Sequence, residues 1–181
     1  MSKPFFKVGE ATVFAAEGQY TDAMPEVLIG TVDGPAGQAF AAMMGQVQGH
    51  TRMFVVRDCN QLVRPPTMMT TKATIKNSAY VELLGGVVQA AIGDAILDCV
   101  IDGTLPREGL DALCMIVMVW LDPRCATHAE LDRKDLYRTN YEATKLAIAR
   151  ALSDEPTIET LIANRHTVRH YALEDVFEPE A

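Results

Sequence analysis

Residues 112–121 read ALCMIVMVWL, an unbroken apolar run that lies between Asp111 and Asp122. A membrane-spanning helix needs about twice this length, so the run does not predict a membrane span. Its length and its charged borders are instead typical of a strand that is buried on both faces. A strand of this kind has to be covered on both sides, and the flanking sequence contains helical patterns that can do so.

Two long apolar stripes at helical spacing occur on either side of this run. One extends from Val81 to Cys99, with a capping residue at position 77 or 78 before it. Gly103 and Pro106 follow as stop signals. The second stripe occupies residues 132–152. The sequence therefore predicts two long helices, one before and one after the buried strand.

The rest of the sequence predicts shorter elements, with β-branched and aromatic residues in the strands. Strands are expected at residues 5–16, 26–32, 52–56 and 67–75, and shorter helices at residues 35–49 and from Thr157. The order β-β-α-β-β-α-β-α predicts an α+β fold in which helices cover a mixed sheet. Because no linker divides the chain, residues 1–181 are expected to form one domain, with an acidic, frayed tail from about residue 174.

The charge and the cysteines limit the partners and the compartment. The chain has 16 Lys and Arg against 24 Asp and Glu, which gives a net charge of −8. This balance argues against direct binding of nucleic acid and against an anionic membrane surface, since both need clustered cations. The four cysteines form no C-x-x-C pair, and no signal-peptide region precedes Glu10. We therefore expect a cytoplasmic protein with reduced thiols.

The usual motifs of cofactor and metal sites are absent from the sequence. It contains no glycine-rich phosphate loop, no dinucleotide fingerprint and no nucleophile elbow. His166 and His170 have helical spacing, and Cys125 and His128 lie three residues apart, but neither pair has an obvious third ligand. We expect these four to be surface residues, and we expect no metal and no cofactor.

Two polar residues stand out from the structural pattern. Alternate side chains of an extended chain share a face, so Lys72 lies with Thr70 and Thr74 on one face of the strand at residues 67–75. Gln89 interrupts the apolar stripe of a helix, where a buried amide needs hydrogen-bond partners. A solvated lysine and a structural amide are the simpler interpretations, so a functional role for either residue stays open on this pattern alone.

These two residues lie in segments that resemble a known family. Residues 64–75, RPPTMMTTKATI, and residues 140–150, NYEATKLAIAR, are similar to segments of the formaldehyde-activating enzyme family, and VGEA at 8–11 and LIG at 28–30 also fit. The resemblance extends from about residue 8 to residue 152. It implies a fold like the second domain of ribosomal protein S5, and a ligand bound between the subunits of a ring.

The resemblance also implies a set of site residues. The family's lysine, threonine and glutamine fall on Lys72, Thr74 and Gln89, so all three are retained. Its leucine falls on Phe54 and its aspartate on Glu26. Together with Met24, these residues are the ligand-binding set that we expect, with formaldehyde as the ligand and the pocket at a subunit interface of a homo-oligomer.

Met24 stands where the family has a histidine, its proposed acid–base residue. Adding an amine to formaldehyde and expelling water moves protons, and a positioned acid–base group speeds such steps by about 10²–10⁴-fold. A thioether has no proton to give. We therefore expect no catalytic residue, and a chain similar to a non-catalytic branch that senses formaldehyde in a stress response and restrains growth and translation.

Two other functions stay open at this point. In the first, Glu26 or water replaces the histidine, and the chain is an enzyme that condenses formaldehyde with tetrahydromethanopterin. In the second, the chain is an assembly module that kept only the fold. An acidic chain suits a basic partner surface such as that of a translation-related protein, although charge alone identifies no partner.

Overall fold

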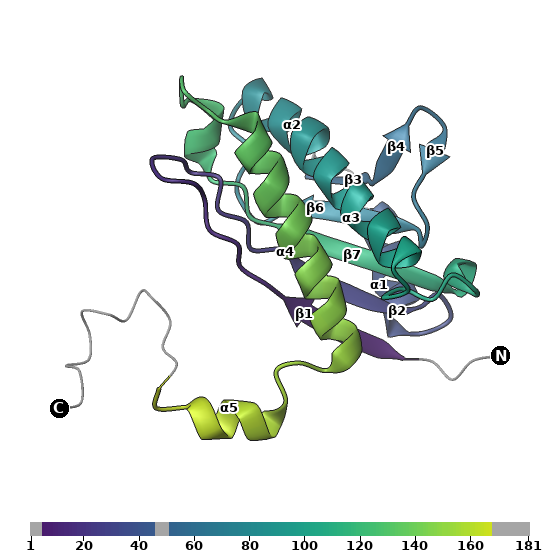
Figure 1. Cartoon of the computed structure of the whole chain (residues 1–181). Helices are drawn as coiled ribbons and strands as arrows, with labels where there is room; N and C mark the ends of the chain where they lie inside the picture. Colours follow the sequence, from purple (N-terminus) through teal and green to yellow (C-terminus); the bar gives the residue numbers. More distant parts are fainter. Residues whose placement is uncertain (1–4, 46–50, 168–181) are drawn as a thin grey trace.

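The computed structural model describes residues 5–45 and 51–167, and its centre is a five-stranded sheet with the order β1-β2-β7-β6-β3 (Figure 1). The central strands β7 and β6 pair in parallel, whereas the other neighbours are antiparallel. A parallel pair needs a long crossover connection, which the helical stretch between β6 and β7 provides. The mixed sheet predicted from sequence is thus confirmed. The strands are β1 (Phe6–Glu10), β2 (Glu26–Thr31), β3 (Arg52–Phe54), β6 (Thr67–Thr71) and β7 (Leu113–Val119).

One face of the sheet is covered by two long helical stretches (Figure 1). The first joins α2 (Ser78–Leu83), a π-helical segment (Leu84–Val88) and α3 (Gln89–Ile101) without a break. The second is α4 (Arg133–Ser153). Odd-numbered residues of β7 point to these helices, and Met115, Val117 and Val119 are accordingly buried to 1% exposure or less. The core therefore lies between this face and the helices.

The two helical stretches begin at side-chain caps, as their sequences suggest. Asn77 accepts a hydrogen bond from the backbone N–H of Tyr80, and Asp132 accepts from those of Lys134 and Asp135. Along their length α3 and α4 are joined by a polar ladder. Its three rungs are the contacts Tyr137–Asp94, Tyr141–Asp98 and Lys145–Asp102. The ladder fixes the register of the two helices on their outer side.

Helix α4 lies very close to the edge strand β1, and Gly9 makes this approach possible. A Cβ atom at this position would lie 2.3 Å from the carbonyl oxygen of Ala147 and 2.6 Å from the backbone nitrogen of Ala151. Any side chain other than hydrogen would thus push the helix away from the strand.

The opposite face of the sheet is only partly covered. Helix α1 (Pro35–Met44) packs on one end of it, where Gly30 leaves room for Ala36. The rest of this face, which we call the open face, presents even-numbered residues such as Val8 and Met118, which are 61% and 37% exposed. The core therefore has one closed side and one side that a ligand or partner can reach.

The smaller elements lie at the margins of the sheet (Figure 1). Strands β4 (Val56–Asp58) and β5 (Gln61–Leu62) form a separate hairpin. Two 3-10 turns, Leu110–Ala112 and Pro123–Ala126, flank β7. Helix α5 (Ile158–Asn164) stands apart from the other helices and buries none of its residues.

Several boundaries differ from the sequence prediction. The strand expected at residues 5–16 stops at Glu10, and only a single bridge between Val13 and Ala23 continues the pairing. The strand expected at 67–75 stops at Thr71, where its pairing with Val119 of β7 ends. Helix α1 ends at Met44 with Gly45 as its cap. The predicted helix end at Gly49 and the predicted frayed tail from residue 174 lie outside the described residues.

One helical stretch of the described chain, Ser78–Ile101, is long and apolar enough to cross a membrane by length and composition alone. The apolar run at 112–121 does not, since it forms β7. A helix that packs in a protein core passes the same test, and Ile92, Ile96 and Cys99 of this stretch are fully buried in the core. The helix therefore already has the apolar environment that its composition requires.

Candidate functional site

An ion pair joins two segments at the edge of the open face. Glu26 opens β2, and Lys72 follows the last residue of β6. The backbone N–H of Lys72 donates to the carbonyl of Val119 at 2.8 Å, which holds this segment beside the end of β7. The Lys72 ammonium then reaches Glu26, with Nζ 2.8 Å from Oε1, and donates to the carbonyl oxygen of Met24 at 3.2 Å.

The pair is accessible from solvent. The Lys72 and Glu26 side chains are 29% and 46% exposed. An exposed pair of this kind contributes only about 0–1 kcal/mol to the free energy of folding. The Glu26 carboxylate and the Lys72 ammonium are therefore held together, accessible to solvent and of little importance for stability. Such a pair can act on a small molecule.

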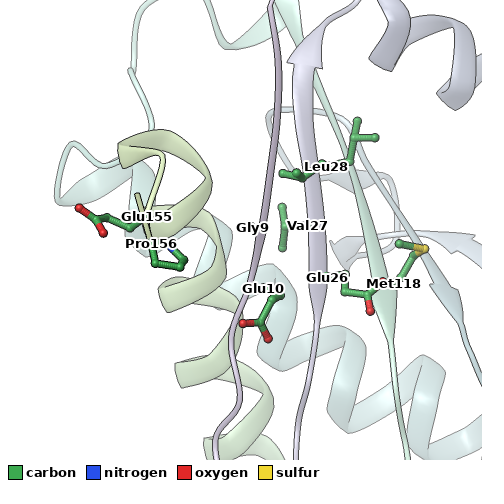
Figure 2. Close-up of a pocket in the computed structure, with 9 residues that line it drawn as sticks. Gly9, Glu10, Glu26, Val27, Leu28, Met118, Glu155 and Pro156 are labelled. Atoms are coloured by element: carbon green, nitrogen blue, oxygen red, sulfur yellow. The ribbon is translucent and has the colours of Figure 1, made fainter. Parts of the chain in front are cut away.

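A hollow of about 430 Å³ opens on one side of this pair. It lies on the apolar part of the open face, and Figure 2 shows Glu10 and Glu26 on neighbouring strands beside it. The loop between α4 and α5 supplies its outer rim, at Glu155 and Pro156. The lining residues are Val8, Gly9, Glu10, Glu26, Val27, Leu28, Met118, Glu155 and Pro156.

A second hollow of about 440 Å³ opens on the other side, beyond Met24. The bridge between Val13 and Ala23 keeps both segments extended past β1 and β2. Since side chains alternate along an extended chain, the residues that directly precede and follow Val13 and Ala23 point outward. The lining is more polar than that of the first hollow. It consists of Thr12, Phe14, Asp22, Met24, Trp120, Asp122 and Arg124.

The charges of the second hollow are largely paired. Arg124 donates to both carboxylate oxygens of Asp122, at distances down to 2.6 Å, and its guanidinium lies 4.0 Å from the ring centroid of Tyr20. The hydrogen bonds from Arg124 lower the pKa of Asp122 below its ordinary value. Asp22 accepts a hydrogen bond from the backbone N–H of Ala15 at 3.0 Å.

The buried thiol near this hollow is not a nucleophile at neutral pH. Cys125 is 2% exposed, and its Sγ donates to the carbonyl oxygen of Tyr20. Burial is the main cause that raises the pKa of Cys125 to about 11. Since the thiolate is the reactive form, the site has to work through its carboxylates, its amine and its aromatic side chains.

The structure brings together three of the six predicted site residues. Met24, Glu26 and Lys72 meet as described above, and Thr74 is exposed two residues further on. Phe54 lies on the same open face but on the edge strand β3, where its ring packs 5.9 Å from that of Phe40 in α1. Gln89 lies on the opposite, helix-covered side. The six residues therefore do not form one pocket within a single chain.

Gln89 belongs to the helix-covered side of the molecule. Its Oε1 accepts from the backbone N–H of Val56 at 3.1 Å, and its Nε2 donates to the carbonyl of Gly85 at 2.6 Å. The Oε1 contact ties the start of α3 to β4, and the Nε2 contact satisfies a carbonyl of the π-helical segment in the same helical stretch. This agrees with the structural role that the sequence left open for Gln89.

Among the described residues, the remaining site candidates form no metal-binding group. Within residues 5–45 and 51–167, no group of three His, Cys, Asp or Glu side chains is arranged to hold a metal ion. Cys125 is buried, contrary to the expectation that it lies on the surface. His170 lies outside the described residues.

Sequence reasoning missed the residues of the second hollow. The apolar run at 112–121 predicts Trp120 only as the end of a buried strand, and no local pattern singles out Asp22. The alternation of side chains along the strand carries the missing signal, because even-numbered residues of the 112–121 run point to the open face. The placement of Asp22 opposite them depends on the order of strands in the sheet, which the sequence does not reveal.

Comparisons with known proteins agree with the resemblance seen in the sequence. The family model described as formaldehyde-activating enzyme matches residues 8–173. A 5,6,7,8-tetrahydromethanopterin hydro-lyase from Methanosarcina barkeri is 41% identical over 155 residues, which are 81% of this chain and 83% of that protein. A bifunctional enzyme Fae/Hps from Archaeoglobus fulgidus is 34% identical over 166 residues, 91% of this chain. The chain spans about 40% of the length of that bifunctional relative.

These relatives contradict the expectation of a non-catalytic formaldehyde sensor, because both carry the names of enzymes. The expectation rested on Met24, which cannot carry a proton. The loss of one acid–base side chain does not exclude another residue that carries the proton. The Glu26 carboxylate is paired with Lys72, which also binds the Met24 carbonyl oxygen. The translation-related partner was tied to the sensor interpretation and stays a prediction.

Proposed function

The chain belongs to the formaldehyde-activating enzyme family, and from this membership we propose that it condenses formaldehyde with tetrahydromethanopterin. In this reaction an amine nitrogen of the pterin attacks the carbon of formaldehyde. The second amine then closes the methylene bridge, and one water molecule leaves. The hydro-lyase name of the Methanosarcina barkeri relative supports a reaction that forms or breaks such a bond with water as a product.

The contact between Glu26 and Lys72 is the observation that carries this proposal. The Lys72 ammonium, 2.8 Å from Glu26, donates to the oxygen of formaldehyde while the amine attacks its carbon. Glu26 carries the proton that the attacking nitrogen loses to this oxygen, which becomes a hydroxyl group. The hydroxyl group takes a second proton from the Lys72 ammonium and leaves as water, and the second amine returns a proton to Lys72 when it closes the methylene bridge. Met24 contributes its backbone carbonyl, which orients Lys72, and takes no part in moving protons.

We further propose that the complete site forms between two copies of the chain. Gln89 lies on the other side of the sheet from Lys72 in one chain, and the open face leaves apolar side chains such as Phe6 and Val8 uncovered, at 49% and 61% exposure. A second copy that packs against this face covers these side chains and adds its residues to the hollow. The free cysteines fit a reducing compartment such as the cytoplasm.

The rate of condensation tests this function directly. Formaldehyde reacts slowly with tetrahydromethanopterin without a catalyst, so methylene-tetrahydromethanopterin is followed by its absorbance with and without protein. We expect the protein to raise the rate in proportion to its concentration. Glu26→Gln should lower the accelerated rate by about 10²–10⁴-fold, because the amide cannot accept the proton.

Glu82→Gln serves as the matched control, since Glu82 is an exposed carboxylate of α2 on the other side of the sheet. It should retain the rate of the unchanged protein. A rate no greater than the spontaneous one would refute the proposed function. Full activity of Glu26→Gln would refute the role of Glu26 and assign the proton transfer to another group.

A further inference from the structure

Tyr80 is a buried tyrosine whose hydroxyl group takes no part in the proposed reaction. It lies in the first turn of α2 and is 2% exposed. Its hydroxyl donates to the carbonyl oxygen of Leu121 at 3.0 Å, and this contact already gives a buried tyrosine the partner that it needs. Burial raises the pKa of Tyr80 above its ordinary value, so the hydroxyl keeps its proton at neutral pH. A second contact of the same oxygen therefore needs its own explanation.

The second contact is with Thr71, the residue directly before Lys72. Thr71 Oγ1 lies 3.0 Å from the Tyr80 oxygen, and it is the donor there because Tyr80 gives its only proton to Leu121. The other acceptor for the Thr71 proton, the carbonyl oxygen of Ala73, is more distant at 3.3 Å. Thr71 Oγ1 also accepts from the backbone N–H of Ala73 at 3.1 Å, which closes a turn around Lys72.

These contacts form one chain of hydrogen bonds that leads from the turn at Lys72 into the core. The Ala73 N–H donates to Thr71, Thr71 donates to Tyr80, and Tyr80 donates to the Leu121 carbonyl just beyond the end of β7. Hydrogen bonds in such a chain polarise and strengthen one another. The buried hydroxyl therefore ties the turn to the part of the chain that follows the central strand.

Lys72 needs such a tie because it begins an irregular connection. Residues 72–77 join β6 to α2 without a helix or strand of their own, and connections of this kind are where a protein opens locally. The Lys72 side chain is partly exposed and carries its ammonium on a flexible stem. The backbone N–H of Lys72 is held by the Val119 carbonyl, and the Tyr80 hydroxyl holds the residues on either side.

We propose that Tyr80 is a positioning residue for Lys72, and that its hydroxyl fixes the turn from which the Lys72 ammonium reaches the reacting oxygen. The inference rests on the proposed function for the task of Lys72. Tyr80 touches no reacting atom, because it lies in the core on the helix-covered side of the sheet. A misplacement of about 1 Å can slow a reaction by about 10²-fold. Because the ammonium acts as charge develops on the oxygen, its misplacement lowers kcat and leaves KM nearly unchanged.

Tyr80→Phe tests this role, since it keeps the buried ring and removes only the hydroxyl. We expect kcat for the condensation to fall by about 10–100-fold. KM for tetrahydromethanopterin should change by less than about 3-fold. Tyr141→Phe is the matched control, because it removes a hydroxyl contact with Asp98 on the outer side of the helices, and it should retain both constants. Urea unfolding of each variant sets a temperature at which all of them are fully folded.

Two substitutions of Thr71 test the same chain from its other end and leave Tyr80 bound to Leu121. Thr71→Val keeps the branched shape that suits a strand but has no hydroxyl, so it should lower kcat by about 10–100-fold, as Tyr80→Phe does. Thr71→Ser keeps the hydroxyl and should stay close to the rate of the unchanged protein. Equal rates of the valine and serine variants would overturn the proposal.

Hydrogen exchange gives a readout that does not depend on catalysis. In Tyr80→Phe the amides of Lys72 and Ala73 keep their acceptors, which are the Val119 carbonyl and Thr71 Oγ1. We expect both amides to exchange about 10-fold or more faster in this variant, because the turn opens more often. The amides of β7 should change by a smaller factor, whereas a general loss of stability would speed all of these amides alike.

The two proposals fail in distinguishable ways. An unchanged kcat in Tyr80→Phe, a loss confined to KM, or Lys72 and Ala73 amides that gain no more than those of β7 would each overturn the positioning role and leave the proposed function intact. A protein that does not accelerate condensation would refute the proposed function. The exchange of the Lys72 and Ala73 amides would then decide alone whether Tyr80 holds the turn.

Discussion

At the scale of single residues, Tyr137 shows how a contact on the outer face of the helices couples stability to pH. Its hydroxyl donates to Asp94 at 2.6 Å, and Asp94 also binds Arg57 at 2.6 Å. Burial, followed by the hydrogen bond to Asp94, raises the pKa of Tyr137 from 10.0 to about 12. The folded protein therefore holds this proton at a pH where the unfolded chain has lost it.

We predict that the contribution of Tyr137 to stability is present below pH 10 and is lost as the pH rises toward 12. Tyr137→Phe keeps the ring that stacks on Tyr141 but has no proton to lose. Its free energy of unfolding, measured with urea across this range, should therefore fall less steeply with pH than that of the unchanged protein. Equal slopes would contradict the assignment, since Cys99 and Cys125 titrate in both proteins.

The sequence predicted the orientation of individual site residues along a strand, but not which residues of distant segments meet. The alternation of side chains placed Lys72 on the outward face, and the structure confirms this. Its partner Glu26 lies 46 positions away in the sequence, and the two meet because β2 and β6 flank β7. That order of strands depends on packing across the whole sheet, so resemblance to a family, and not periodicity, indicated Glu26.

At the scale of elements, the contact of β1 with α4 depends on the absence of one side chain. We predict that Gly9→Ala lowers the free energy of unfolding by about 1–3 kcal/mol, because its Cβ would lie 2.3 Å from the carbonyl oxygen of Ala147. Gly86→Ala is the matched control, since no atom outside the neighbouring backbone of its own helix lies within 4 Å of a Cβ at that position.

The control should be neutral or gain up to about 1 kcal/mol, because alanine restricts the unfolded chain. Urea unfolding of the two variants side by side measures the difference. A Gly9→Ala protein as stable as Gly86→Ala would show that the helix moves away from β1 at no cost.

The types of the main elements were predictable from sequence, but their ends were not. Hydrophobic spacing and caps located the long helices to within a few residues. The end of β6 at Thr71 coincides with the end of its neighbour β7 at Val119, which is a property of two segments together. The π-helical segment at Leu84–Val88 likewise lies inside a pattern that predicts ordinary helix.

At the scale of the whole molecule, stability is concentrated between the sheet and its two long helices. Helix α5 lies outside this region, with Ile158, Leu161 and Ile162 at 62%, 53% and 54% exposure. We predict that Leu161→Ala changes the free energy of unfolding by no more than about 0.5 kcal/mol. Ile96→Ala, at a fully buried position of α3, should cost about 2–5 kcal/mol.

Thermal and urea unfolding of both variants provide the measurement. A large loss in Leu161→Ala would mean that α5 packs against another copy of the chain, and the comparison would then depend on protein concentration.

The position of β7 makes hydrogen exchange along this strand a measure of global unfolding. This strand is hydrogen-bonded on both edges, to β2 and to β6, and lies beneath the helices, so fraying of the ends of the chain does not reach it. Its amide protons are released to solvent only when the sheet comes apart as a whole. The rate of deuterium uptake along this strand therefore reports the frequency of global unfolding. Uptake in less protected segments reports local unfolding.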